Sequence, residues 1–372
     1  MPLDPFKYGR IVSGQDFCGR ETLLREIIGH IKSSQNIVIQ GERRIGKTSV
    51  IYEAVRRYKG IRLLYADLLG IKSIDALCRR ILKAIVLLEQ KAGLFDRIMK
   101  TLSYLRPSLS MDPITLMPTL TFDASVELKA NSIPEVLSLI ESFYKKKRLV
   151  VVFDEFQDIL NLDDAREALA LLRSKIQFQT DIPYIFAGSI RKKMDEIFTH
   201  PDSPFFKSAI PITLGPLPYD EFSEFLRKKF AAGKRRINDD LLRKVFEVVY
   251  EIPGDIQQFC EALWSVTSDH ETIGQNKLKD TLELIFAREQ KSYENDLSLL
   301  TDFQIRCLLA IAREGGNNIL SVAFLKSAGV NNPSSVQRAM TRMVNLNILY
   351  KSKKEHRFVN PFFRAWVNYR GV

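Results

Sequence analysis

Two short segments of the chain carry residues whose types and spacing suit chemistry on a phosphate group. In the first, GERRIGKTS at residues 41–49, the glycines, lysine and threonine follow the pattern G-x-x-x-x-G-K-[ST]. Gly41 and Gly46 permit backbone conformations that a Cβ would hinder, so that successive N–H groups can surround a phosphate. Lys47 would reach the β- and γ-phosphates, and the Thr48 hydroxyl would bind Mg²⁺. The segment therefore predicts a phosphate-binding loop.

The second segment, RLVVVFDEFQDI at residues 148–159, places two carboxylates directly after an apolar run. Asp154 would hold the Mg²⁺ shell, and Glu155 would orient and deprotonate an attacking water, as phosphoryl transfer to water requires. An isolated Asp-Glu pair after a strand is usually only the start of a helix. Because this pair follows a phosphate loop in the same chain, we interpret it as the acidic part of one site.

A phosphate loop must follow a buried strand and begin a helix, because the loop and the helix N-terminus hold the phosphate charge together. NIVIQ at residues 36–40 is typical of a short strand buried on both faces, and TSVIYEAVRRYKG at residues 48–60 is typical of a helix closed by glycine. Both flanks of the loop therefore support the phosphate-binding interpretation.

Further apolar runs predict the rest of a sheet. RLLYADL (62–68), PYIFAGS (183–189) and IPITLGPL (210–217) bring the count to five strands with helices between them. This alternation predicts an α/β fold with a doubly wound parallel sheet. Ser189 ends one of these strands, where it could sense the γ-phosphate or the water, although Gly-Ser after a strand is also ordinary turn chemistry.

The last part of the chain predicts a helix-turn-helix followed by a wing. Residues 300–316 have a threonine N-cap, a helical apolar period and a closing glycine pair. Two more helices are predicted in SVAFLKSAG and in NPSSVQRAMTRMVNLNIL, and ILYKSKKEHRFVN at residues 348–360 adds two β-prone segments around a basic turn.

This module offers a set of polar and basic side chains to a duplex. On the third helix, residues suited to the major groove are Ser334, Ser335, Gln337, Arg338, Thr341 and Arg342, and those suited to the DNA backbone in the wing are Lys351, Lys353, Lys354 and Arg357. Winged helices also serve as interdomain clamps or protein docks, so the partner stays open between double-stranded DNA and protein. The aromatic segment FVNPFFRAWV is expected to pack on the preceding parts of the protein, either the α/β core or a lid domain that follows the core.

The charge distribution favours a polyanionic partner. The formal net charge is +11, and residues 301–372 hold eleven Lys or Arg against three acids, Asp302, Glu314 and Glu355. Such a concentration indicates nucleic acid first, and a merely solvated basic surface is the alternative.

Composition limits the class of protein. The chain has 372 residues with 45% apolar and 27% charged content, which predicts a multidomain soluble protein. The N-terminus has no apolar signal core and no run approaches the length of a membrane helix, so we expect a cytoplasmic protein without membrane contact. The four cysteines, which are Cys18, Cys78, Cys260 and Cys307, lie far apart and are expected to be reduced rather than to bind zinc.

Several of these segments together resemble one family. FCGRE (17–21), GERRIGKTS, VVFDEFQDI, AGSIRKKMDEIF (187–198) and SPFFKSAIPITLGPL (203–217) are similar to archaeal-type P-loop ATPases, an AAA+/STAND-related family also found in bacteria. The tail segments SSVQRAMTRMVNLNIL and FVNPFFRAWV resemble the C-terminal winged helix of that family, so the resemblance covers nearly the whole chain.

The resemblance implies ATP and Mg²⁺ as ligands, ATP hydrolysis, a helical lid and a winged-helix module. It implies a core at residues 1–217, a lid at 218–295 and a winged helix at 296–372. The implied nucleotide-binding residues are Gly41, Glu42, Arg43, Arg44, Ile45, Gly46, Lys47, Thr48 and Ser49, with Gly19 and Arg20 near adenine or ribose. The implied catalytic residues are Lys47, Glu155 and Ser189, with Thr48 and Asp154 at the metal.

The pattern departs from the wider AAA+ proteins in the lid. EIPGDIQQFCEALW, residues 251–264, offers Gln257 and Gln258 where many relatives place an arginine, so lid closure would respond to nucleotide differently. Arg191 is a candidate arginine finger or else a surface helix residue. Residues 105–129 could form an extra hairpin for a partner or an edge extension, and the basic run RKKFAAGKRR (227–236) is either a nucleic-acid contact or a solvated helix end.

The leading hypothesis is a switch in which ATP and Mg²⁺ close the lid and reposition the winged helix on DNA or on a protein partner. The alternative is a non-catalytic adaptor that holds ATP for stability and binds DNA or protein through the winged helix. A kinase or small-molecule transferase is a third possibility, which the adjacent carboxylates and the winged tail disfavour. Oligomeric state stays open.

Overall fold

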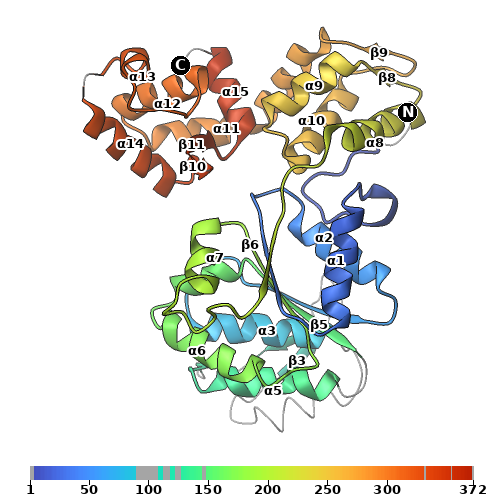
Figure 1. Cartoon of the computed structure of the whole chain (residues 1–372). Coiled ribbons are helices and arrows are strands. Elements are labelled where there is room, and N and C mark those ends of the chain that lie inside the picture. Colours follow the sequence, from blue (N-terminus) through green and yellow to red (C-terminus); the bar gives the residue numbers. More distant parts are fainter. Residues whose placement is uncertain are drawn as a thin grey trace. The chain divides into compact units, whose positions relative to one another are not determined.

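The chain folds into two compact units (Figure 1). The computed structural model describes residues 4–88, 108–111, 118–121, 127–144, 148–330, 332–352 and 354–370. One unit is Ile11–Gly215, and the other combines the described residues up to Arg10 with those from Pro216 onward. The predicted core, residues 1–217, included the N-terminal segment. The buried ring of Phe6 instead lies 4.6 Å from that of Phe230, in the second unit.

The first unit is built on one parallel sheet. Its strands are β1 (Ile37–Gln40), β2 (Arg62–Asp67), β5 (Leu149–Asp154), β6 (Tyr184–Gly188) and β7 (Ile210–Thr213), in the order β2-β5-β6-β1-β7. All pairings are parallel. The three inner strands, β1, β5 and β6, are buried along their whole length, as strands covered on both faces must be. The predicted five-stranded α/β fold is confirmed.

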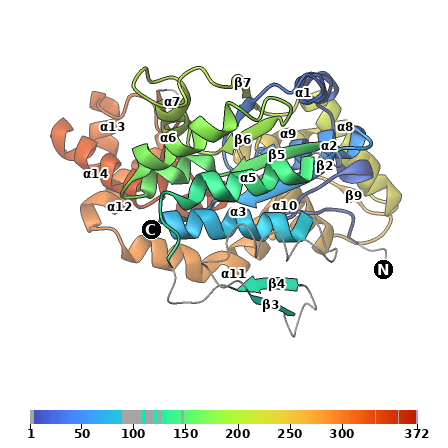
Figure 2. The ribbon, with the colours of Figure 1, turned by 90° about the horizontal axis from the view of Figure 1, so that it is seen from below.

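Helices cover both faces of this sheet. They are α1 (Glu21–Lys32), α2 (Lys47–Arg57), α3 (Ile74–Leu88), α5 (Ser132–Tyr144), α6 (Ala165–Ile176) and α7 (Arg191–Phe198), with short 3-10 helices η1 (Gly14–Asp16) and η3 (Phe156–Asn161). Figure 1 shows α1 and α2 on the side of the sheet opposite α3 and α5, and Figure 2 shows α3 and α5 side by side. Apolar residues of α3, α5 and α6 form one core with alternate strand residues such as Leu64, Val151 and Phe186.

The predicted insertion at residues 105–129 contains a two-stranded antiparallel hairpin, formed by β3 (Ser108–Met111) and β4 (Pro118–Thr121). The rest of the insertion before residue 127 lies outside the described residues.

The second unit begins with a helical part. It comprises α8 (Tyr219–Ala232), α9 (Asp239–Val248), α10 (Pro253–Ser265) and the long helix α11 (Lys277–Ser298), with two short paired strands β8 (Arg236–Ile237) and β9 (Thr272–Ile273). Pro253 occupies the first turn of α10, where its missing N–H leaves no unmet hydrogen bond. This part corresponds to the predicted helical lid.

A winged helix follows in the same unit. Its elements are α12 (Asp302–Glu314), α13 (Val322–Ser327), α14 (Pro333–Asn345), β10 (Leu349–Ser352), β11 (Glu355–Phe358) and α15 (Pro361–Arg370). Thr301 caps α12 in a capping box with Gln304, and Gly315 ends that helix. Strands β10 and β11 pair antiparallel as the predicted wing. The predicted helix-turn-helix and wing are therefore confirmed.

The aromatic C-terminal segment packs inside this unit. The rings of Phe363 and Trp366 on α15 lie 5.3 Å and 5.4 Å from the ring of Tyr293 on α11, and all three side chains are buried. Burial of three aromatic side chains fixes α15 on α11. This agrees with the expected packing role of FVNPFFRAWV.

Two kinds of feature, a membrane-spanning helix and a metal-binding cluster, are absent from the described part of the chain. No helix in it is long and apolar enough to cross a bilayer, and no group of three or more His, Cys, Asp or Glu side chains is placed to hold a metal ion. All four cysteines are free thiols.

Candidate functional site

The sheet register brings the predicted site segments to one edge. Asp154, at the end of β5, pairs with Asp67 at the end of β2, and Gln40, at the end of β1, pairs with Gly188 at the end of β6. The loop after β1 and Ser189 after β6 therefore emerge at the same carboxyl-terminal edge as the acidic pair. This is where ligands bind in open α/β sheets.

Two glycines shape the loop between β1 and α2. A Cβ on Gly41 would lie 2.9 Å from the carbonyl oxygen of Leu214, so only glycine allows this approach of the loop to the end of β7. Gly46 has a φ of +98°, which L side chains rarely adopt, and it immediately precedes α2. No side chain caps the N-terminus of α2, so its amides stay available to an anion.

Lys47 reaches across this loop. Its Nζ donates to the carbonyl oxygens of Gly41 and Glu42 at 3.0 and 3.1 Å, and the side chain is only 6% exposed. Burial lowers the pKa of Lys47, and the nearby carboxylates of Glu155 and Asp154 oppose that shift. The ammonium group therefore lies inside the loop and within the field of both predicted acidic residues.

The carboxylate of Asp154 is held by three donors. Thr48 Oγ1 and the Tyr65 hydroxyl donate to Asp154 Oδ2 at 2.8 and 2.6 Å, and the Glu155 N–H donates to Oδ1 at 2.9 Å. Burial and the charge of Asp154 raise the pKa of Tyr65, so its hydroxyl remains a donor. The structure thus joins the two predicted metal residues directly.

Glu155 is held on one side of its carboxylate. Ser189 Oγ donates to Glu155 Oε2 at 2.7 Å, and Gln157 Nε2 donates to the same oxygen. Glu155 itself has a left-handed backbone with φ of 49° at the start of η3. Backbone strain of this kind clusters at functional sites. The hydrogen bond from Ser189 places the predicted sensor residue in contact with the predicted base.

Arg20 lies next to the loop but binds the protein itself. Its guanidinium NH2 donates to the carbonyl oxygens of Ile45 and Gly215 at 3.1 and 2.8 Å. Gly19 has a φ of +67° and precedes Arg20, whose φ is also positive at 63°. These contacts tie the segment before α1 to the loop, which places it beside the predicted nucleotide site.

The remaining loop residues divide into exposed and buried positions. The side chains of Arg43 and Arg44 are exposed, whereas Ile45 and Ser49 are buried and Glu42 is half-buried. Ser49 Oγ accepts a hydrogen bond at 3.1 Å from the N–H of Val12. This bond also fastens the N-terminal segment to the first turn of α2.

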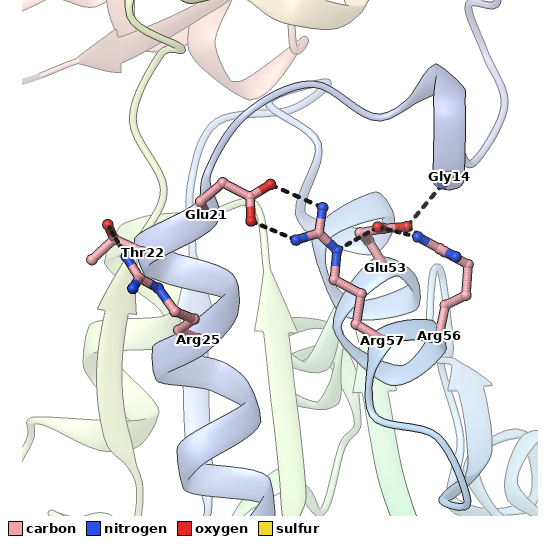
Figure 3. A network of polar contacts seen from close by, with 7 residues as sticks. All are labelled: Gly14, Glu21, Thr22, Arg25, Glu53, Arg56 and Arg57. Atoms are coloured by element: carbon pink, nitrogen blue, oxygen red, sulfur yellow. Dashed lines mark hydrogen bonds and ion pairs between the residues drawn. The ribbon is translucent and has the colours of Figure 1, made fainter.

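A buried carboxylate makes a second fastening farther along α2 (Figure 3). Glu53 is 0% exposed and accepts hydrogen bonds from the Gly14 N–H at 2.9 Å and from the guanidinium groups of Arg56 and Arg57. Arg57 extends the network to Glu21 on α1. The network holds residues 12–14 and α1 against the helix that follows the phosphate loop.

We expect Glu53→Gln to lower the free energy of unfolding by about 2 kcal/mol at pH 7, because charge-assisted hydrogen bonds to a buried carboxylate are lost. The hydrogen bond from Arg56, with those from Gly14 and Arg57, lowers the pKa of Glu53 to about 2. The stabilisation is therefore complete above the unfolded-state pKa, about 4.3, and is lost as the pH falls towards 2.

Urea unfolding of the two proteins between pH 7 and pH 3 measures this difference. The difference in the free energy of unfolding between wild type and Glu53→Gln should become smaller below about pH 4.3. Glu26→Gln, at an exposed position of α1, is the matched control and should leave stability unchanged. A difference that stays constant over this pH range would show that Glu53 does not stabilise the fold through its charge.

The donor set fits a nucleoside triphosphate with Mg²⁺. The glycine cradle leaves backbone amides open, and Lys47 supplies one positive charge at the loop. A hydroxyl and a carboxylate, from Thr48 and Asp154, are the oxygen ligands that Mg²⁺ prefers when it is bound mainly through phosphates and waters.

The polar face of α14 is exposed as predicted for a contact surface. Ser334, Gln337, Arg338, Thr341, Arg342 and Asn345 line a shallow depression there, and Val336, Ala339, Met340 and Met343 are buried beneath. In the wing, Lys351 and Lys354 are exposed and Lys353 lies outside the described residues. Arg357 differs, because its guanidinium pairs with Glu355 at 2.7 Å and lies 5.1 Å from the ring of Tyr250.

Three residues at the site were not foreseen. Tyr65 and Glu53 lie in a predicted strand and a predicted helix, whereas Gln157 lies in η3, which the sequence did not predict. Nothing in the local pattern separates the three from packing residues. The useful signal for Tyr65 is its place near the carboxyl end of a strand. For Glu53, the signal is a polar residue that the helical period places on a buried face of α2, whereas Gln157 has no such signal.

Comparison with known proteins agrees with this geometry. Residues 30–193 match the family model of an AAA domain, and residues 291–369 match that of a probable winged helix domain. The chain therefore contains an AAA domain followed by a winged helix domain. The resemblance to P-loop ATPases with such a module is thereby confirmed. The comparison with curated proteins finds no match.

Two solved structures are similar to this AAA protein over nearly their whole length. The Walker-type ATPase PABY2304 of Pyrococcus abyssi has 19% identity and a TM-score of 0.62, with 94% of this chain and 96% of that chain covered. The ORC1 protein of Aeropyrum pernix, in complex with DNA, has 11% identity and a TM-score of 0.53, with 96% and 94% covered. At these identities the likeness shows a shared fold.

Proposed function

We propose that this AAA protein is an ATP-binding and ATP-hydrolysing switch whose nucleotide state controls what the winged helix contacts. The observation that carries the proposal is the hydrogen bond from Thr48 to Asp154, at 2.8 Å, between residues 106 positions apart. It joins the end of the phosphate loop to the acidic strand. Mg²⁺-nucleotide chemistry needs both segments.

Each residue of the site then has a task in phosphoryl transfer to water. Lys47 neutralises phosphate charge, and its low exposure keeps that charge effective because little water screens it. Thr48 and Asp154 would hold Mg²⁺, which when bound offsets negative charge on the phosphate oxygens. The loop amides and the N-terminus of α2 orient the phosphates.

Glu155 is the candidate base. Ser189 and Gln157 both donate to Oε2, and among the described residues no hydrogen bond reaches Oε1. That arrangement fixes the carboxylate and leaves one oxygen to orient a water and accept its proton. Ser189 therefore acts on Glu155 directly, which supports its proposed role as a sensor.

The second unit contains a connection through which lid movement would reach the winged helix. Glu289 on α11 accepts hydrogen bonds from Gln258 on α10 and from Asn360, the residue directly before α15. Tyr293 donates to the same carboxylate at 2.8 Å. We propose that residues 218–295 act as the lid and that residues 296–372 follow its movement through these contacts.

Duplex DNA is the partner that the exposed face of α14 supports best. Arg338 and Arg342 lie on this face, and α14 contains no acidic residue. Lys351 and Lys354 add exposed positive charge in the wing. Basic and amide side chains on one helix face suit phosphate and base contacts in a major groove. A protein partner is the alternative outcome.

Phosphate release from ATP by the intact chain tests the first part of the proposal. We expect ATP turnover that requires Mg²⁺ and stops when EDTA is added, because Thr48 and Asp154 act in the proposed mechanism by holding the metal. Tight nucleotide binding with a raised melting temperature but no turnover would instead establish the non-catalytic adaptor. Absence of nucleotide binding would overturn both functions.

A further inference from the structure

The phenol of Tyr65 occupies a position at the site that neither the phosphate loop nor the acidic pair explains. Its hydroxyl donates to Asp154 Oδ2 at 2.6 Å, the same oxygen that accepts from Thr48 Oγ1 at 2.8 Å. The N–H of Glu155 occupies the other oxygen, Oδ1, at 2.9 Å. Asp154 is 5% exposed, so these donors replace the water that a free carboxylate would bind.

Rigid elements set the position of Tyr65. It lies on β2, where it pairs in register with Val152 of β5, two residues before Asp154. Its ring lies 5.4 Å from that of Tyr52 on α2, in an edge-to-face arrangement. A side chain fixed by the pairing of β2 with the inner strand β5 and by an aromatic contact has little freedom to leave the carboxylate.

Mg²⁺ binding would affect differently the two hydroxyls that donate to Asp154 Oδ2, those of Thr48 and Tyr65. Thr48 is the expected ligand of Mg²⁺, so its oxygen must serve both the metal and Asp154. Phenols are not among the groups that Mg²⁺ prefers, so the Tyr65 hydroxyl can hold Asp154 in the same way with and without the metal. Partners of this kind orient metal-binding carboxylates and tune their affinity.

We propose that Tyr65 is a positioning residue that sets the Mg²⁺ affinity of the nucleotide site by orienting the carboxylate of Asp154. The inference rests on the proposed nucleotide function and adds to it a residue outside both sequence motifs. It requires that loss of the hydroxyl weakens the metal-dependent part of nucleotide binding and leaves the metal-independent part unchanged.

Tyr65→Phe removes only the oxygen, and Tyr52→Phe is its matched control. Tyr52 is the aromatic neighbour of Tyr65, and no hydrogen bond to its hydroxyl is found among the described residues. The Mg²⁺ concentration that half-saturates binding of a fluorescent ATP analogue is measured for both variants and the wild type. Affinity for the same analogue in EDTA is the reference, and thermal unfolding without nucleotide checks the fold.

For Tyr65→Phe we expect the half-saturating Mg²⁺ concentration to rise about tenfold, with affinity in EDTA unchanged. Tyr52→Phe should match the wild type in both measurements. Equal Mg²⁺ dependence in Tyr65→Phe and wild type would overturn the inference, as would an equal loss of affinity with and without Mg²⁺, which indicates a merely structural role. If wild type binds no nucleotide, the proposed function fails, and the inference fails with it.

Discussion

Replacement of Glu155 by glutamine is expected to lower the rate of ATP turnover about 100-fold or more and to leave the affinity for Mg²⁺-ATP nearly unchanged. The amide has the shape of the carboxylate, so it can still accept from Ser189 and Gln157, which hold Oε2 in the native protein. It cannot take a proton from water. The loss should therefore appear in the chemical step and not in binding.

Phosphate release under saturating ATP and equilibrium binding of a labelled nucleotide separate these two effects. Glu167→Gln is the matched control, since it makes the same chemical change at an exposed position on α6. It should leave both measurements at wild-type values. Unchanged turnover in Glu155→Gln would remove Glu155 from the mechanism and favour the adaptor function.

Lys47→Ala is expected to weaken ATP binding about 100-fold, because charge-assisted hydrogen bonds to phosphate of about 3 kcal/mol are lost and 1.4 kcal/mol is a factor of ten in affinity. The native ammonium is 6% exposed and already lies 3.0 Å from the Gly41 carbonyl oxygen, so the loop holds its charge in place before a ligand arrives. The effect should be on affinity whether or not Mg²⁺ is present.

Titration with a fluorescent ATP analogue, in Mg²⁺ and in EDTA, measures this loss. Lys59→Ala removes an exposed lysine just beyond the other end of α2 and is the control for net charge. It should bind as wild type does. If Lys47→Ala also bound as wild type does, the loop would not be a phosphate site, whatever its glycine spacing.

Local patterns were sufficient for most of the fold. The strand before Gly41, the acidic strand ending at Asp154 and the helix capped by Thr301 each follow from apolar period and end signals within about a dozen residues. The structure has them at β1, β5 and α12. The winged helix followed from the same kind of signal, because its helix ends and basic turn are local features.

Contacts between distant segments account for what sequence reasoning missed. Tyr65 meets Asp154 because β2 and β5 are neighbours in the sheet, and no local signal gives the order of strands. Arg20 binds the carbonyl oxygen of Gly215, 195 positions away. The expected core at residues 1–217 included Phe6, whose apolar ring is buried against Phe230 in the other unit. Such pairings depend on tertiary packing, which propensity does not encode.

If nucleotide state controls the winged helix, the affinity of Glu155→Gln for a duplex should differ between Mg²⁺-ATP and Mg²⁺-ADP. Fluorescence anisotropy at fixed salt gives both values, and Arg338→Ala with Arg342→Ala is the control for the α14 face. We expect affinities that differ at least about fivefold between the nucleotides, a usual size for coupling between sites. The control should bind the duplex weakly in both nucleotides. Equal duplex affinity in ATP and ADP would show that nucleotide state does not control the winged helix.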